Sequence, residues 1–352
     1  MDIVPYLKLM VEKNASDLFF TVGARVKIKM EGQQKPVGKS ILTSELSRGA
    51  AYGIMSDDQI KDFEQNLECD FAITMPGGDA RFRVNVFRQR GEVAMVLRLI
   101  PSEIPTLQQL KLPLILNELI MHKRGLILMV GATGSGKSTT LAAMIDHRNR
   151  GAAGHILTIE DPVEFAHPNH ESIVNQREIG VDTYSYRAAL RSSLREAPDV
   201  ILIGEIRDRE TMEAALELSN TGHLAISTLH ANNANQALER VVNLFAQDQH
   251  KQLFMDLSLN LRAIISQRLV MGVDQKRCAA IEIMMTTPHI AELILKGDID
   301  EVKEAMATSG AKGMQTFDDA LFKLFKDGRI TLEEALGNAD SKTNLEAKIN
   351  FG

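Results

Sequence analysis

The sequence lacks tryptophan, has two cysteines, and is only 5% aromatic over its 352 residues. Cys69 and Cys278 are too few for a disulfide framework or a four-thiolate zinc site, and this cysteine usage is typical of a reducing compartment. No run approaches the roughly 18 apolar residues that a membrane-spanning helix needs. Acids and lysines replace the basic start and apolar run of a secretory signal. We therefore expect a cytoplasmic protein that meets a membrane only through partners.

The chain also lacks a large excess of charge of either sign. The chain carries 40 Lys and Arg against 46 Asp and Glu, for a formal net charge of -6. A general nucleic-acid binder usually presents a basic face and aromatic side chains that stack on bases. This balance argues against direct nucleic-acid binding, although one basic stripe can hide within the sum.

The pattern along the chain predicts two folded regions and a helical end. Residues 1–98 combine short alternating strands with a helical stretch and indicate an α+β domain. Residues 99–113 contain three prolines, typical of an interdomain linker. Residues 114–270 alternate apolar strands with helices. From about residue 235 the pattern is mostly helical, and residues 271–352 are expected to form a helical region with a polar tail.

Short apolar strands separated by helices predict an α/β domain whose parallel sheet is covered on both faces. The strands expected in this second region are 125–131, 155–161, 199–205 and 223–230. Those expected in the first region are 17–22, 25–33, 69–75, 80–91 and 92–100, with a helical stretch at 44–66 and turns at 76–78 and Gly91.

The strongest motif is a glycine-rich phosphate loop between a predicted strand and a predicted helix. It fits G-x-x-x-x-G-K-[ST] and comprises Gly131, Ala132, Thr133, Gly134, Ser135, Gly136, Lys137 and Ser138, followed by Thr139. Glycines let backbone N–H groups turn inward around phosphate, and the helix dipole adds to the attraction. We expect Lys137 to reach the β- and γ-phosphates and Ser138 to ligate Mg²⁺. A glycine-rich turn that binds no nucleotide is the alternative.

Acidic residues follow two of the predicted strands. Glu205 ends a buried run and is a candidate for orienting or deprotonating the attacking water, which separates a hydrolase from a binding protein. The alternative is that Glu205 pairs with Arg207 or caps the next helix. Glu160, Asp161 and Glu164 end an earlier strand and are candidates for a Mg²⁺ or water role, with a solvated loop as the alternative.

Two histidines, His223 and His230, flank the last predicted strand of the sheet. A lone histidine is most often a structural residue, and this alternative stays open for both. A zinc site is a weak hypothesis here, because no acid or thiol lies at matching ligand spacing.

Five arginines gather within eighteen residues of the first region. Arg81 and Arg83 alternate with apolar residues, so both should project from one face of a strand. Arginine fingers accelerate phosphoryl transfer by roughly 10³–10⁵, and fingers in a separate domain can be delivered across a head-to-tail subunit interface. The alternative is a solvated sheet face or a set of salt-bridge donors. The five are Arg81, Arg83, Arg88, Arg90 and Arg98.

Together these motifs carry a family resemblance. The phosphate loop, TIEDPVEF (158–165), DVILIGEIRDRET (199–211), TGHLAISTLHANNA (221–234) and GMQTFD (313–318) resemble the secretion-type hexameric motor ATPases. Within these, the chain is similar to the type IV pilus retraction ATPases of the PilT/PilU family. ASDLFF and ARFRVNVF resemble the N-terminal domain of that family, so the likeness covers nearly the whole chain.

The resemblance implies a fold and a function. It implies a cytoplasmic homohexamer with a PAS-like N-terminal domain and a RecA-like ATPase domain, peripheral at the inner-membrane base of the pilus machine. ATP and Mg²⁺ would be its cofactors, and hydrolysis would move the domains against an inner-membrane platform protein.

The resemblance also implies roles for the candidate residues. Glu205 would be the catalytic glutamate, holding Mg²⁺ through water. Glu160, Asp161 and Glu164 would form an acidic box, with Glu160 and Glu164 catalytic and Asp161 binding the cofactor. His230 would be catalytic and His223 would bind the cofactor. Arg81, Arg83 and Arg98 would be the candidate fingers.

Two departures point to the accessory, PilU-type branch of the family. Where the principal retraction motor has AIRNLIRE, this chain has HIAELILK (289–296), so Ala291 and Leu295 replace two arginines. A longer tail also follows GMQTFD. The tail is either a docking element or a mobile end, and its acidic content favours a mobile end. The resemblance therefore implies an ATPase that assists a principal, PilT-like motor. The alternatives from other classes are a nucleotide-gated adaptor that does not hydrolyse ATP and a nucleic-acid-translocating RecA-like ATPase.

Overall fold

The computed structural model describes residues 1–30, 33–77, 80–101 and 103–351, and it divides into two compact units. The first unit is Met1–Glu103 with Glu164–Ala166, and the second is Ile104–Val163 with His167–Gly352. Gly78 of the expected turn and Ser102 of the expected linker lie outside the described residues.

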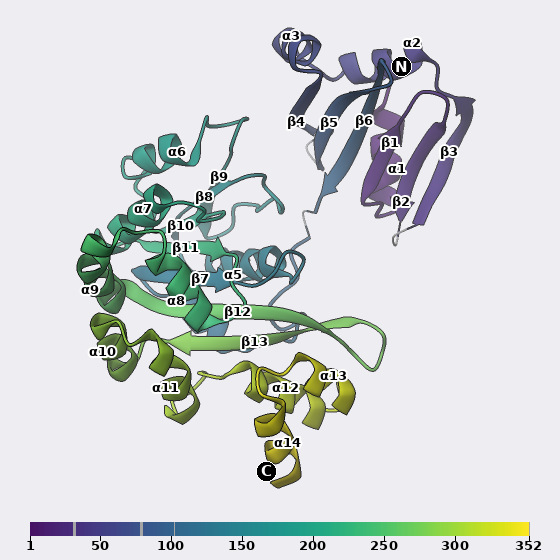
Figure 1. Cartoon of the computed structure of the whole chain (residues 1–352). Helices are drawn as coiled ribbons and strands as arrows, with labels where there is room; N and C mark the ends of the chain where they lie inside the picture. The colour runs from purple at the N-terminus through teal and green to yellow at the C-terminus, as the bar shows by residue number, and fades with distance from the viewer. Residues whose placement is uncertain (31–32, 78–79, 102, 352) are drawn as a thin grey trace. The chain divides into compact units, whose positions relative to one another are not determined.

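The first unit is an antiparallel sheet packed against helices (Figure 1). Its six strands have the order β3-β2-β1-β6-β5-β4. The N-terminal helix and β3 were not expected. The expected helix at 44–66 is two helices, because Ser56 begins the second with a capping box. The elements are α1 (Val4–Glu12), β1 (Asp17–Phe20), β2 (Arg25–Met30), β3 (Gln33–Ile41), α2 (Ser44–Tyr52), α3 (Asp57–Asn66), β4 (Glu68–Thr74), β5 (Arg81–Gln89) and β6 (Glu92–Ile100).

Alternation along β5 decides which side chains form the core of this unit. Phe82, Val84 and Val86 are buried, whereas Arg81 and Arg83 project from the other face of the strand and are half-buried. The expected pattern of two arginines on one strand face is therefore confirmed.

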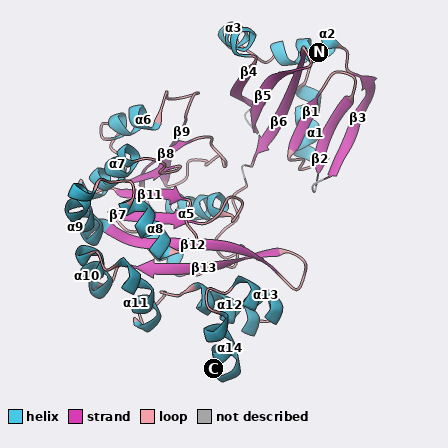
Figure 2. Ribbon diagram, in the orientation of Figure 1, coloured by secondary structure: helices cyan, strands magenta, loops and turns pink. Residues whose placement is uncertain are grey.

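The second unit contains a sheet of seven strands in the order β13-β12-β7-β11-β10-β8-β9 (Figure 2). Every neighbouring pair is parallel except β12 and β13. The strands are β7 (Gly125–Val130), β8 (Gly154–Glu160), β9 (Ser172–Glu178), β10 (Val200–Ile203), β11 (Leu224–Leu229), β12 (Leu261–Met271) and β13 (Arg277–Met285). The expected parallel α/β sheet is confirmed.

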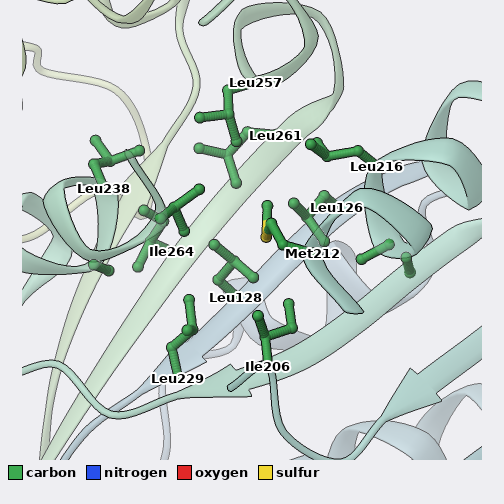
Figure 3. Packing of buried hydrophobic residues seen from close by; sticks show 14 of the residues in the cluster. Leu126, Leu128, Ile206, Met212, Leu216, Leu229, Leu238, Leu257, Leu261 and Ile264 are labelled. Atoms are coloured by element: carbon green, nitrogen blue, oxygen red, sulfur yellow. The ribbon is translucent and has the colours of Figure 1, made fainter. Parts of the chain in front are cut away.

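Helices cover both faces of this sheet. Because β7 is buried on both sides, it is apolar throughout. Leu126 and Leu128 of β7 face a cluster with residues of α6–α11, and Figure 3 shows the part of it contributed by α7, α8 and α9. Ile127 and Met129 face α4 and α5 on the other side of the sheet. The helices are α4 (Ile115–Ile120), α5 (Lys137–Gly151), α6 (Tyr186–Ser193), α7 (Arg209–Asn220), α8 (Ala234–Val242), α9 (His250–Asn260), α10 (Pro288–Lys296) and α11 (Val302–Thr308).

The region expected to be mostly helical also contains β12 and β13. A domain boundary at residue 270 would fall one residue before the end of β12 and would separate two paired strands. The helices α10 and α11 and those of the tail agree with a helical C-terminal region. The apolar, β-branched run of β12 satisfied a helical pattern as readily as a buried strand, which periodicity alone does not separate.

The C-terminal tail is folded onto the second unit, against the mobility that the sequence favoured. It follows α12 (Phe317–Lys326) as α13 (Leu332–Asn338) and α14 (Lys342–Phe351). Leu345 is fully buried in a cluster with Phe317 and with Val270 of β12. Lys348 forms an ion pair with Asp319 of α12. One buried leucine and one ion pair therefore anchor a helix that has no continuous apolar stripe.

Among the described residues, no helix is both long and apolar enough to cross a membrane.

Candidate functional site: a phosphate loop beside a paired glutamate

The phosphate loop connects the buried strand β7 to α5. Gly131, Gly134 and Gly136 have φ values of 150°, 77° and 87°, a region that side chains rarely adopt. A Cβ at Gly131 would lie 2.5 Å from the Gln267 carbonyl oxygen, and one at Gly136 would lie 2.8 Å from Gln267 Nε2. Glycine is therefore required by conformation and by space, and the backbone cradle predicted from the motif is present.

A strand neighbour, Gln267 of β12, holds the loop in this shape. Its Nε2 donates to the Ser135 carbonyl oxygen at 2.8 Å, and its Oε1 accepts from the Thr140 hydroxyl at 2.7 Å. Gln267 is almost fully buried. Sequence reasoning missed this residue; the available signal was an amide directly after the run LRAIIS (261–266).

Lys137 closes over the loop at the start of α5. Its Nζ donates to the carbonyl oxygens of Gly131 and Ala132, at 2.7 and 3.0 Å. Ser138 and Thr139 follow in the first turn and are half-buried. The ammonium group therefore sits at the mouth of the cradle, where phosphate oxygens are its natural partners.

Parallel strands bring the candidate acids and His230 to the edge of the sheet where the phosphate loop lies. The order β7-β11-β10-β8 means that the loops after these strands share one edge. Strand spacing of about 4.8 Å puts the end of β10 roughly 10 Å from the end of β7, within reach of a bound triphosphate. Glu205 follows β10, His230 follows β11 and Glu160 ends β8.

Glu205 is held on both of its carboxylate oxygens. Arg207 Nε donates to Oε2 at 2.8 Å, and His230 Nε2 lies 3.0 Å from Oε1. The Glu205 side chain is 15% exposed, whereas those of Arg207 and His230 are 67% and 43% exposed. The hydrogen bond to Glu205 raises the pKa of the Arg207 guanidinium above its ordinary value. Pairing with Arg207, left open by the sequence, is thus present, and so is contact with the candidate histidine.

Tyr186, at the start of α6, is a second residue that the sequence did not single out. A Cβ at Gly204 would lie 2.6 Å from its hydroxyl, so the phenol lies directly over the residue before Glu205. Burial raises the pKa of Tyr186 well above its ordinary value, and the nearby carboxylates of Asp161, Glu160 and Glu205 raise it further, against a lowering effect from Arg207. The phenol therefore remains protonated and can donate a hydrogen bond in this acidic pocket.

The residues of the acidic box are divided between the two units. Glu160 is half-buried and accepts hydrogen bonds from Thr158 Oγ1 at 2.6 Å and Gln176 Nε2 at 3.2 Å. Asp161 is exposed next to it. Glu164 is exposed and belongs to the first unit. Glu160 and Asp161 thus lie at the edge of the second unit's sheet that carries the phosphate loop.

His223 lies at the opposite end of β11 from His230. Its carbonyl oxygen accepts from the N–H of Gly125, the first residue of β7, at 3.0 Å, and its Nδ1 lies 3.1 Å from the Leu218 carbonyl oxygen. The phosphate loop follows the other end of β7. His223 therefore lies at the edge of the sheet away from the phosphate loop, and its role in cofactor binding stays a prediction.

The candidate arginine fingers belong to the first unit. Arg83 and Arg98 are opposite each other in the β5–β6 register. Arg98 Nε donates to Asp17 Oδ1 at 2.8 Å, and the Asp17 side chain is only 5% exposed. The alternative of a salt-bridge donor therefore describes Arg98.

Two cavities open beside the phosphate loop. One of about 620 Å³ is lined by Gly136 and Thr139 and by the cations Lys276, Arg277 and Arg329. The other, of about 590 Å³, is lined by Ala132 and His230 and by α8. Within the described residues, no group of three His, Cys, Asp or Glu side chains is arranged to hold a metal on its own. A divalent ion here would need oxygen atoms from a bound phosphate.

The site combines a parallel α/β sheet, a glycine-rich loop, a lysine at the mouth of that loop and a neighbouring acid. These features define a P-loop nucleotide-hydrolysing enzyme. The comparisons agree. The family model described as type II/IV secretion system protein matches residues 2–343. The type IV pilus ATPase PilU of Pseudomonas aeruginosa is 52% identical over 353 residues, covering 100% of this chain and 92% of that protein.

Further relatives extend the likeness to solved structures. The type IV pilus retraction ATPase PilT of Pseudomonas aeruginosa is 42% identical, covering 98% of this chain and all of that protein. The crystal structure of the pilus retraction motor PilT with bound ADP matches with a TM-score of 0.91 at 41% identity, over 98% of this chain and 99% of that chain. The chain therefore belongs to the type II/IV secretion system protein family, and it is an ATPase of the PilT/PilU kind.

We predict that Gln267→Leu weakens ATP binding about tenfold, because it removes two buried hydrogen bonds that shape the loop. Titration with a fluorescent ATP analogue measures the affinity. Gln252→Leu, on the exposed face of α9, is the matched control and should bind as the unaltered protein does. Equal affinities for the two variants would show that Gln267 does not support the loop.

Proposed function

We propose that this chain is a Mg²⁺-dependent ATPase motor that assists type IV pilus retraction. It works as a homohexamer on the cytoplasmic side of the inner membrane, acts on the pilus platform protein, and depends on a principal, PilT-like motor. The observation that carries the proposal is the placement of the phosphate loop, Glu205 and His230 at one sheet edge, in a chain that matches retraction ATPases end to end.

The residues of the site fit ATP. A glycine loop in which a Cβ at Gly131 or Gly136 would clash with Gln267, with a lysine at its mouth, suits a polyphosphate. Ser138 and, through water, Glu205 would hold Mg²⁺, which supplies charge neutralisation to the phosphates when bound. The cavity beside Gly136 and Thr139 has the size and the cations to take the base and ribose.

Within this site each residue has a separate task. Lys137 leaves the loop carbonyls for the phosphate oxygens. Glu205 orients the attacking water, and His230, in contact with Oε1, fixes the direction of that carboxylate and faces the cavity beside Ala132. Arg207 holds the other oxygen. Charge on the transferring phosphoryl group exceeds what one lysine neutralises, so we assign the remaining cations to Arg81 and Arg83 of a neighbouring subunit.

The accessory role is supported by the surface of α10. Ile290, Leu293 and Ile294 are buried, whereas Leu295 is 53% exposed and Ala291 half-buried on the outward side of the helix. These two positions carry arginines in the motif of the principal motor. The two positions that are cationic in the principal motor are therefore apolar in this chain. This changes which partners the ring can bind without altering the nucleotide site.

We predict that Glu205→Gln lowers kcat for ATP hydrolysis by about 10²-fold or more, because the amide no longer accepts a proton from water. Affinity for ATP should stay within about threefold, since the loop is untouched. Lys137→Ala should lose both binding and turnover.

The matched control for this series is Glu213→Gln, which removes an exposed ion pair with Arg209 outside the site. Malachite-green phosphate release and ATP-analogue titration give the two readouts. Unchanged turnover in Glu205→Gln would remove Glu205 from the mechanism and favour a nucleotide-gated adaptor.

Hexamers mixed from two inactive variants should recover activity. An Arg81→Ala/Arg83→Ala subunit offers an intact phosphate loop, and a Lys137→Ala subunit offers intact arginines, so some interfaces are complete. We expect a maximum of about one quarter of full activity near equal mixing, as random neighbours imply. A flat zero at every ratio would refute fingers delivered between subunits.

In cells, removing this chain should reduce retraction under load, and removing the principal motor should abolish retraction whether or not this chain is present. The reason is that the ATPase site is complete here while the α10 surface differs. Fluorescently labelled pili report retraction frequency in single and double deletions. Full retraction by this chain alone would contradict an accessory role.

A further inference from the structure

The C-terminal segment, residues 332–351, contacts β12 of the central sheet. Asn338 Nδ2 donates to the Glu334 carbonyl oxygen, and Glu334 Oε1 accepts from the N–H of Met271 at the end of β12, at 2.8 Å. Asp318 Oδ1 accepts from the N–H of Asp340 at 2.8 Å, which fixes the connection between α13 and α14. The segment is thus tied both to β12 and to α12.

Arg268 of β12 is the centre of this contact. Its Nη1 lies 2.8 Å from Asp340 Oδ1 and donates to the Asn338 carbonyl oxygen at 3.0 Å. Its guanidinium carbon lies 3.8 Å from the centre of the Phe317 ring. Asp340 is 10% exposed and also pairs with Lys303 at 2.8 Å. Burial favours a higher pKa for Asp340, but Lys303 and Arg268 outweigh it and lower the pKa, so the carboxylate stays charged.

The same guanidinium reaches the catalytic edge. Arg268 Nη2 donates to the Asn232 carbonyl oxygen at 3.3 Å. Asn232 belongs to the His230 loop, residues 230–233, whose first residue contacts Glu205. One side chain therefore joins the C-terminal segment to the loop that carries His230.

The far end of the His230 loop is fixed from β13. Glu282 Oε1 accepts from the N–H of Ala234 at 2.8 Å and from Ser266 Oγ at 3.0 Å. Among the described residues, the Glu282 carboxylate accepts hydrogen bonds from Ala234 and Ser266 and from no residue of the tail, so Arg268 is the hydrogen-bonding contact through which the tail bears on the loop. The neighbouring residue Gln267 points to the other face of β12 and supports the phosphate loop.

We propose that the C-terminal segment positions the His230 loop through Asp340 and Arg268 and thereby sets the rate of ATP hydrolysis. The inference rests on the proposed function of the site. Arg268 and Asp340 are positioning residues, because they contact neither nucleotide nor Glu205. When the segment is docked, the Arg268 guanidinium contacts Asp340 on one side and the Asn232 carbonyl oxygen on the other, and His230 contacts Glu205. When the segment is released, Arg268 loses its ion pair with Asp340. Its hydrogen bond to the His230 loop is then no longer held in place.

The test compares tail contacts that do and do not involve Arg268, in the full-length protein. We expect Asp340→Ala to lower kcat about tenfold with KM for ATP changed less than about threefold, because the phosphate loop keeps Gln267. Asp340→Glu keeps the charge and should recover kcat to within about threefold of the unaltered protein. Lys348→Ala, which removes an ion pair of α14 remote from Arg268, should stay within about twofold.

A second background separates positioning from simple loss of stability. In His230→Ala protein, adding Asp340→Ala should lower kcat by less than about twofold, since the two changes remove the same arrangement. Thermal melting of each variant reports folding alongside the rates. A full additional tenfold loss in the His230→Ala background would overturn the inference.

Equal rates for Asp340→Ala and Lys348→Ala would also overturn it. These results differ from a failure of the proposed function, in which the unaltered protein would show no hydrolysis and Glu205→Gln would change nothing. If the unaltered protein is active and only the tail variants behave alike, the site assignment stands and the coupling through Arg268 is wrong.

Discussion

The parallel register of β8, β10, β11 and β7 is the constraint on which the site depends. Hydrogen bonding aligns Ile159 with Ile203 and Ile203 with Ser227, so the chain leaves each strand at the same edge. Residues separated by dozens of positions thus meet without any dedicated local structure. The apolar strands are buried on both faces, and their packing fixes this alignment more firmly than contacts among the exposed site residues would.

The sequence predicted the phosphate loop, the parallel sheet and the position of Glu205, because each has a local signature. The loop needs glycine at fixed spacing, and a carboxylate after a buried strand marks the ligand-binding edge. The resemblance groups His223 with His230, and the direction of β11 puts the two at its opposite ends. Gln267 could not be assigned, since its partner Ser135 lies 132 residues away in the chain.

Other features were hidden because their meaning depends on tertiary pairing. Arg98 resembled its neighbours in the sequence, yet it finds a buried carboxylate, Asp17, on a strand 81 residues earlier. Tyr186 begins an ordinary amphipathic helix and becomes notable only where its hydroxyl lies over Gly204. The acidic composition of the tail favours mobility, whereas the burial of Leu345 holds the tail in a fixed place. In each case a single long-range contact outweighed the local pattern.

The support that Gln267 gives to the phosphate loop has an energetic consequence. A loop that Gln267 already holds through Ser135 and Thr140 need not lose conformational entropy when ATP arrives, since that loss occurs once, during folding. Capture of the nucleotide then leaves most of its interaction free energy for moving the rest of the chain. A rigid phosphate loop in this sense favours mechanical work, because little of the free energy of ATP binding is used to order the loop itself.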